Sequence, residues 1–279
     1  MTDQMAIKLG SYARRKFGAE IWGTGTCCIG LAPVPGKLVT RKVGPPVIDG
    51  EFYARARHDV RSPLTAILGF AESMDEAIFG PLGHEKYDEY AAAIHQSGLG
   101  LEKIFTAILA ILSLDADART LSEDALSAEQ VFEELDQNWS GRAEQWSVSL
   151  RFKLNADLPA FTADRRRLVQ TLDCILENAL SYTNDGGRVT VSGHVNGAGA
   201  FVFVVEDTGP GMTGPDLEIA LAPFGRIPEA AAHGRRGAGL GINLAAGIMA
   251  LHQGGLSIIC PPDRGLKAEL TLPEARLKL

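Results

Sequence analysis

The chain has 279 residues, of which 46% are hydrophobic and 22% are charged, and its formal net charge is -7. This length is enough for two compact domains, and the composition is that of an ordinary soluble globular protein. The acidic surplus argues against nucleic acid as the main partner, because the phosphate backbone attracts basic proteins. The chain has no run of about 18 apolar residues and no secretory leader pattern, so we expect a cytoplasmic protein without direct membrane insertion.

The N-terminal region and the cysteines carry little functional information. The four cysteines do not form paired CxxC spacings, so we expect neither a zinc site nor a disulfide framework. Residues 1–50 are punctuated by glycine and proline and show no long periodicity. We therefore expect an N-terminal segment and linker there, whose role the sequence does not reveal.

Two heptad stripes occupy residues 51–115 and predict a helical hairpin. Apolar or small residues recur at alternating spacings of four and three on both sides of the turn FGPLGHE. The first stripe is Val60, Leu64, Ile67, Ala71, Met74 and Ile78, and the second is Tyr87, Tyr90, Ile94, Ser97, Leu101, Ile104, Ile108 and Ile111. One antiparallel hairpin cannot bury both stripes well, but two copies can do so as a four-helix bundle, so we expect a homodimer.

A hinge and a mixed α/β domain are expected after the hairpin. Residues 116–128 are small and polar, as suits a hinge, and the α/β domain follows over residues 129–279. Its predicted helices cover about 127–143, 164–182 and 239–252, and its predicted strands about 147–154, 188–195, 200–207, 254–260 and 266–273. Residues 208–238 are rich in glycine and proline and predict one long irregular loop, a kind of segment that is usually functional.

His58 lies in the string HDVRSPLTAI on the first heptad stripe. If Val60 faces the seam, then His58, Asp59 and Ser62 face solvent. A carboxylate beside an exposed imidazole can hold one ring nitrogen protonated, so the other nitrogen offers its lone pair for nucleophilic attack. Ser62 is one turn further along the same face, where its hydroxyl can position a water molecule. These three residues are the candidate catalytic group.

Two glycine-rich segments predict a nucleotide site. In VEDTGPGM, an aspartate that follows a predicted strand can accept a hydrogen bond from an exocyclic amine such as that of adenine. The second segment, RRGAGLGINLA, opens a predicted helix whose first amides suit a phosphate. The residues concerned are Asp207, Gly209, Gly211, Gly237, Gly239, Leu240 and Gly241. A dinucleotide-binding fold fits poorly, because no βαβ unit surrounds the second segment.

Further polar groups suit a magnesium–triphosphate complex. Asn178, in ENALSYTNDGG on a predicted helix, offers a neutral oxygen of the kind that Mg²⁺ shares with phosphates, unless it is a buried or capping asparagine. Arg226, Arg235 and Arg236 lie between the glycine segments and can neutralise phosphate charge, unless they form a solvated face.

Taken together, the motifs over about residues 51–273 resemble those of the histidine kinases of two-component signalling. HDVRSPL resembles the H box, ENALSYT the N box, EDTGPGM the G1 box, APFGRI the F box and GAGLGI the G2 box. The resemblance implies these roles: His58 as phosphoacceptor, Asn178 as magnesium ligand, Asp207 as adenine ligand, Tyr182 as a further nucleotide contact, Phe224 in the lid and Arg226 near the γ-phosphate.

The resemblance also implies the family's fold and partners. The expected fold is a helical hairpin that dimerises into a four-helix bundle, followed by an α/β sandwich ATP-binding domain of the GHKL type. ATP and Mg²⁺ are the implied cofactors, and a response regulator receiver domain is the implied partner. It would take the phosphoryl group from His58 onto an aspartate and be dephosphorylated with the help of Ser62. GFAES, FGPLG and KYDEYAAAIHQSG resemble the PleC and DivJ type within the family.

Departures from the family pattern leave alternatives open. Cys174 stands where the N box usually begins with asparagine, and Ser181 stands where a lysine often touches phosphate. A lost charge-assisted contact costs about 1.5–3 kcal/mol, which favours a degenerate kinase acting as a receiver-binding scaffold or phosphatase. A different GHKL ATPase that uses the nucleotide as a clamp would keep the glycine segments, but it would not need HDxxSP on a dimerising hairpin. The stimulus and the cognate receiver are not visible in the sequence.

Overall fold

The computed structural model describes residues 38–80, 83–117, 121–154, 158–227, 238–261 and 265–278. All of these belong to one compact unit, Pro35–Leu279. Arg235, Arg236 and Gly237 lie outside the described residues, so the predictions made for them stay untested.

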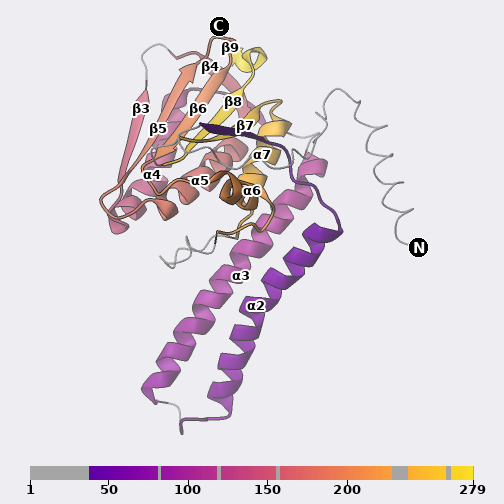
Figure 1. Ribbon diagram of the computed structural model, residues 1–279, viewed down its shortest axis with the longest axis vertical. Helices are drawn as coiled ribbons and strands as arrows, with labels where there is room; N and C mark the ends of the chain where they lie inside the picture. Colours follow the sequence, from indigo (N-terminus) through magenta and orange to yellow (C-terminus); the bar gives the residue numbers. More distant parts are fainter. Residues whose placement is uncertain are drawn as a thin grey trace, which may run out of the picture. The chain divides into compact units, whose positions relative to one another are not determined.

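The first part of this unit is an antiparallel helical hairpin, as the heptad stripes predict. Helices α2 (Gly50–Asp75) and α3 (Glu85–Asp117) run side by side (Figure 1). Asp49 begins α2, because its carboxylate accepts a hydrogen bond of 2.9 Å from the Phe52 amide in the first turn. At the far end, the Tyr87 hydroxyl donates to the Gly80 carbonyl at 2.8 Å and so fixes the bend between the helices.

The hairpin carries more apolar surface than it buries. By length and composition α3 is apolar enough over Glu85–Leu114 to cross a membrane, although a helix packed between protein surfaces passes the same test. Besides the apolar residues of α3 that face α2, this helix carries Phe105, Leu109 and Leu112, which are apolar and exposed. Adjacent exposed apolar residues of this kind favour a site at which another surface packs.

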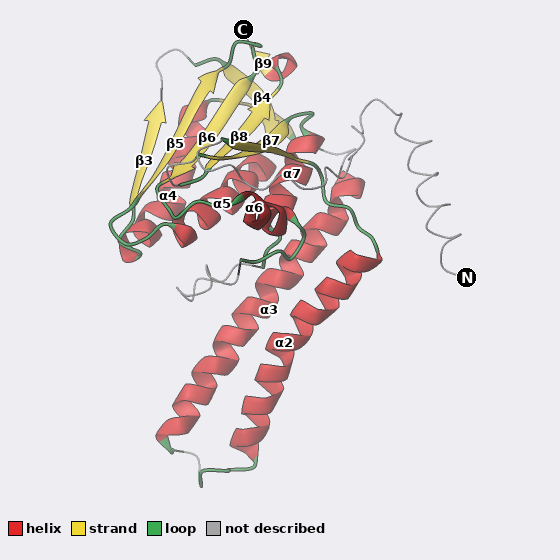
Figure 2. Ribbon diagram, viewed as in Figure 1, coloured by secondary structure: helices red, strands yellow, loops and turns green. Residues whose placement is uncertain are grey.

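The second part is an α/β domain with a sheet in the order β1-β7-β8-β6-β5-β3. The strands are β1 (Val39–Val43), β3 (Ser149–Leu154), β5 (Arg188–Val195), β6 (Phe201–Asp207), β7 (Gly255–Cys260) and β8 (Lys267–Leu272). Helices α4 (Ala128–Gln145), α5 (Arg165–Tyr182) and α7 (Gly241–Leu251) cover one face of this sheet (Figure 2). A second sheet, in the order β2-β4-β9, consists of β2 (Glu123–Leu126), β4 (Ala160–Asp164) and β9 (Leu277–Lys278).

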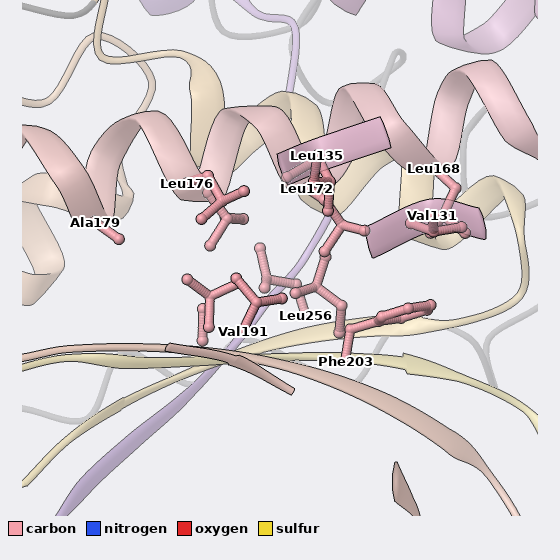
Figure 3. Packing of buried hydrophobic residues seen from close by; sticks show 14 of the residues in the cluster. Val131, Leu135, Leu168, Leu172, Leu176, Ala179, Val191, Phe203 and Leu256 are labelled. Atoms are coloured by element: carbon pink, nitrogen blue, oxygen red, sulfur yellow. The ribbon is translucent and has the colours of Figure 1, made fainter. Parts of the chain in front are cut away.

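The core lies between these helices and the sheet (Figure 3). Leu172 and Leu176 of α5 and Leu135 of α4 are fully buried against Val191 and Phe203 of the strands. In β7 and β8 every second side chain is buried, which is the alternation that a sheet covered on one face requires. This core fixes the strand and helix ends from which the functional loops leave.

Several short elements lie where regular structure was not predicted, among them β4 and β9, which fall outside all predicted strands. Strand β1 falls within the expected N-terminal linker, β2 falls within the expected hinge, and α6 (Gly214–Leu221) falls within the expected irregular loop. Strand β1 reads VTRKV, with three exposed residues between its two valines, so its alternation is too short to be noticed. Helix α6 had a usable signal, because Thr213 and Asp216 form a capping box at its start.

Candidate functional site

His58 is an exposed histidine on α2 with a carboxylate beside it. Its side chain is 83% exposed, and its Nδ1 atom lies 3.1 Å from Oδ1 of Asp59. An ionised carboxylate can only accept, so Nδ1 carries the proton and Nε2 presents its lone pair to solvent. The structure places this carboxylate beside the imidazole, while the role of His58 as a nucleophile stays a prediction. Ser62 is exposed one turn further along α2.

Asp59 does not face solvent, which corrects the prediction made from the heptad. Its side chain is only 15% exposed, because Arg226 covers it and donates from Nη2 to Oδ2 at 2.9 Å. The two oxygens of Asp59 therefore serve two different partners, His58 and Arg226. The heptad analysis missed this contact because the partner lies 167 residues further along the chain.

Arg226 reaches α2 from a tight turn that follows α6. Phe224 has a φ of +61°, and a Cβ on Gly225 would lie 1.7 Å from the carbonyl oxygen of Ile219, so only glycine fits there. The Phe224 amide donates to the Gly239 carbonyl at 2.9 Å, which joins the turn at Phe224 to the segment just before α7. Gly225 was not singled out from the sequence, although it lies inside the APFGRI motif.

The same turn packs directly against α2. The rings of Phe224 and Phe52 are 5.3 Å apart, and Arg55 donates from Nη1 to the Pro223 carbonyl at 3.0 Å. A hollow of about 470 Å³ remains between the turn and α2, lined by His58, Asp59 and Arg226 among others. His58 therefore lines an open hollow instead of a packed surface.

Asp207 ends β6 and forms a largely buried acidic group. It is 8% exposed, and its Oδ1 accepts hydrogen bonds from the Gly209 amide at 2.8 Å and the Leu266 amide at 3.2 Å. Within the described ranges no group donates to its Oδ2, which is therefore the oxygen available to a ligand. Burial raises the pKa of Asp207 to about 6, with a smaller contribution from Glu206, while the two amide hydrogen bonds oppose the rise.

Glycines bring the backbone close to this carboxylate. A Cβ on Gly209 would lie 2.9 Å from both the Asp207 Oδ1 and the Tyr182 carbonyl oxygen, and a Cβ on Gly265 would lie 2.1 Å from the Asp207 carbonyl oxygen. Gly211 has a φ of +73°, in the region that glycine tolerates. Gly265 was missed from the sequence, because nothing local links it to β6.

A third group of predicted residues meets at the start of α7. The ideal Cβ position of Gly241 lies 3.5 Å from Cβ of Cys174 and 3.8 Å from Nδ2 of Asn178, so α5 faces this turn. Asn178 is half-buried, and its side-chain amide has no hydrogen-bond partner among the residues that the structure describes. The first helical hydrogen bond of α7 runs from the Leu244 amide to the Leu240 carbonyl, so within the described part of the chain the amides before it are open to an anion.

The structure thus gathers the predicted residues into three neighbouring groups. His58 and Asp59 meet Phe224 and Arg226, while the Asp207 and Asn178 groups lie at strand and helix ends of the α/β domain. Gly239 has a φ of +68° and contacts the Phe224 turn. Leu240 is fully buried in a hydrophobic cluster, so only its backbone can face a nucleotide.

Two family models match the chain. Residues 49–117 match the His Kinase A (phospho-acceptor) domain. Residues 163–276 match the histidine kinase-, DNA gyrase B-, and HSP90-like ATPase domain. The two matches follow one another along the chain and correspond to the hairpin and the α/β domain.

Similar proteins carry both parts. The cell-division control histidine kinase PdhS of Brucella suis is 33% identical over 235 residues, which cover 81% of this chain and 23% of PdhS. The PdhS of Brucella abortus is 32% identical over the same length, so the chain spans about a quarter of these relatives. Among solved structures, histidine kinase ThkA in complex with response regulator protein TrrA has a TM-score of 0.64 at 22% identity, covering 81% of this chain and 61% of ThkA. Full-length ShkA in complex with AMPPNP has a TM-score of 0.58 at 24% identity, covering 81% of this chain and 46% of ShkA.

Proposed function

Because the chain belongs to the histidine kinases of two-component signalling, we propose that it transfers the γ-phosphoryl group of ATP to its own His58 and then to an aspartate of a response regulator. The observation that carries this proposal is the exposed His58 ring, whose Nδ1 lies 3.1 Å from Asp59 and which lines a hollow beside the turn at Phe224, Gly225 and Arg226, called the lid turn below. The PdhS and ThkA relatives support the same activity.

Different residues have different roles in the proposed transfer. Asp59 keeps the Nδ1 proton of His58 in place and stabilises the charge that the ring gains as Nε2 attacks phosphorus. Oδ2 of Asp207 accepts a hydrogen bond from the adenine amine, and the first amides of α7 hold phosphate oxygens. Phosphoryl transfer depends mainly on such positioning and charge neutralisation.

The chain's own groups fit a nucleotide with magnesium. Oδ2 of Asp207 is unpartnered within the described ranges, Gly209 and Gly265 keep the backbone close to it, and the Asn178 amide is free to offer its oxygen. Mg²⁺ would neutralise phosphate charge at Asn178 when bound, since it prefers oxygen ligands shared with phosphates. The groups around Asp207 thus favour an adenine base.

We further propose a homodimer and a receiver-domain partner. The exposed stripe of α3 and the exposed Leu64 and Leu68 of α2 form an apolar face that a second hairpin would cover as a four-helix bundle. His58 and Ser62 are both exposed, so a receiver domain can reach the phosphohistidine, and Ser62 can help to dephosphorylate that receiver after the transfer. In this proposal α3 packs against α2 on one side and against the second hairpin on the other, and the protein is cytoplasmic.

The experiment is incubation of purified protein with γ-labelled ATP and Mg²⁺, beside His58→Ala. Label that is lost in acid, survives in base and is absent from His58→Ala is the expected result. Label that persists in His58→Ala would overturn the assignment of the phosphoacceptor. Adding a purified receiver domain should then move the label to that domain.

A degenerate kinase is the second candidate, and Cys174 favours it. Cys174 lies beside the Gly241 turn, and burial raises the pKa of its thiol to about 12, so the thiol stays neutral and is a weak ligand. In that case ATP would still bind while no phosphohistidine formed. Restoration of labelling by Cys174→Asn with Ser181→Lys would assign the defect to these two positions.

A further inference from the structure

Strand β1 precedes the hairpin in sequence but is a strand of the α/β sheet (Figure 1). It pairs antiparallel with β7 over its whole length, from Val39 opposite Cys260 to Val43 opposite Leu256. Val39 and Val43 pack against the main core. On the same side of β1, Arg41 forms an ion pair of 3.5 Å with Glu218 of α6, the helix that leads into the lid turn.

The α/β domain is therefore connected to the hairpin twice. Residues 44–49 join β1 to the start of α2, and residues 118–122 join the end of α3 to β2. At about 3.5 Å per residue these connections span at most about 25 Å and 21 Å. Both attach at the same end of the hairpin, and His58 is only about 12 Å along α2 from that end.

The first connection, residues 44–49, also packs against the rest of the chain. Ile48 packs against a hydrophobic cluster that includes Phe52 of α2, Leu114 of α3, Phe224 of the lid turn and Ile248 of α7. This cluster joins the top of the hairpin to the lid and α7 of the same chain. Lys103 of α3 adds an ion pair of 3.0 Å with Glu177 of α5. A domain held by a strand, a packed linker and this cluster has little freedom to reach the hairpin of another subunit.

We infer that β1 is a second tether that makes transfer of the γ-phosphoryl group to His58 a reaction within one chain. This inference rests on the proposed kinase function. Nε2 of His58 forms the new N–P bond, the bond from phosphorus to the bridging oxygen breaks, and ADP leaves with that electron pair. Asp59 holds the Nδ1 proton while the bond forms, and the charged ring then loses this proton to solvent. Phe224 and Arg226 bring the lid to the same chain's α2, which is the geometry this step uses.

The test pairs two inactive chains in one dimer. His58→Ala keeps the nucleotide site but lacks the acceptor, whereas Asn178→Ala keeps the acceptor but lacks the proposed magnesium ligand. The two chains carry different tags and are purified through both. With γ-labelled ATP, the mixed dimer should show less than about a tenth of the wild-type label. Labelling of the Asn178→Ala chain near the wild-type rate would overturn the inference.

A second pair of variants tests the role of β1. Val39→Asp with Val43→Asp would place carboxylates against the core and detach the strand. Introduced into both chains of the mixed dimer, this change should let label appear on the Asn178→Ala chain. The matched control is Thr40→Asp with Lys42→Asp, which puts the same side chains on exposed positions of β1 and should leave the mixed dimer unlabelled.

The outcomes separate the two claims. Absence of label from the wild-type homodimer would defeat the proposed kinase function and this inference with it. Label in the wild type together with cross-labelling in the first mixed dimer defeats only the inference. If Val39→Asp with Val43→Asp in an otherwise wild-type homodimer still gives label, while the same change in the mixed dimer gives none, then a feature other than β1 enforces the one-chain reaction, and the tether is wrong.

Discussion

At the scale of single residues, Asp59 connects the nucleophile to the lid. Asp59→Asn keeps the shape but removes the negative charge that His58 and Arg226 share. We expect autophosphorylation to slow by about 10²- to 10⁴-fold, the range for a lost acid–base group, with little change in ATP affinity. Quantified labelling rates and nucleotide titrations check this. Arg57→Gln, an exposed neighbour on α2, is the control, and an unchanged rate in Asp59→Asn would contradict the role.

Asp207 should make nucleotide binding depend on pH. Its pKa is raised to about 6, so the carboxylate is ionised at pH 7.5 and largely protonated at pH 5. We expect affinity for an ATP analogue to fall as pH drops through 6. Asp207→Asn should bind more weakly at pH 7.5 by about 1.5–3 kcal/mol, the value of a hydrogen bond to a charged group. It should also lose that part of the pH dependence, whereas equal pH profiles for the two proteins would refute the role.

The same raised pKa has the opposite consequence for stability. An acid whose folded pKa lies above its ordinary value of 3.8 destabilises the fold when ionised, so its unfavourable contribution grows as pH rises from about 4 to 6. Asp207→Asn should therefore unfold at an equal or higher temperature than wild type at pH 7.5 while it binds nucleotide less well. A calorimetric melt measures this, and a clear loss of stability would show that the charge is stabilised by the fold.

Functional residues could be predicted from the sequence where the groups that act together are adjacent in the chain. His58 beside Asp59, or Asp207 followed by glycines, can be recognised from adjacent letters, because each motif lies in one turn or one strand end. The partners of these residues could not be predicted in that way. Arg226 contacts Asp59 across 167 positions, and the Leu266 amide contacts Asp207 across 59. Such pairs depend on which loops the fold brings together.

At the scale of elements, His252 joins α7 to the start of α5. Its ring is fully buried, with Nδ1 donating to the Ile248 carbonyl and Nε2 accepting from the Asp164 amide at 3.0 Å. The ring must stay neutral to accept that hydrogen bond. Burial lowers the pKa of His252, and nearby Arg276 lowers it further, while the Ile248 bond, Asp164 and Glu123 oppose the change.

This histidine should make the α/β domain sensitive to acid. A base whose folded pKa lies below its ordinary value of 6.5 contributes stability above that pH and loses it as pH falls through 6.5. We expect the free energy of unfolding to drop between pH 7.5 and 5.5. His252→Gln can still donate and accept but does not titrate, so its drop should be smaller. Denaturant titrations at the two pH values check this, and parallel drops would exclude His252 as the cause.

Elements were predicted where their periodicity is long. The heptads gave both hairpin helices, and the alternation gave β5 and β6 close to their observed bounds. Strand β1 was not predicted, because only two of its side chains point inward and its partner β7 lies more than 200 residues further along the chain. Helix α6 was hidden by the glycine and proline around it, although its capping box marked its start.

At the scale of the whole molecule, the exposed stripe of α3 predicts assembly. Phe105 and Leu109 lie one turn apart and are exposed. Phe105→Asp with Leu109→Asp would put charges into the seam of the proposed four-helix bundle, where burying an unpaired carboxylate is costly. We expect the molar mass measured by light scattering to fall from that of a dimer to that of a monomer.

The control adds the same charges to the opposite side of the same helix. Ala92 and Gln96 are exposed and lie on the other side of α3, about half a turn around the helix axis from that stripe. Ala92→Asp with Gln96→Asp should therefore leave the dimer intact. If transfer to His58 occurs within one chain, the monomer made by the Phe105 and Leu109 variant should still label itself. A monomer that is folded and binds ATP but takes no label would show that the second hairpin is needed for the chemistry, whereas a variant that stays dimeric would remove this stripe from the interface.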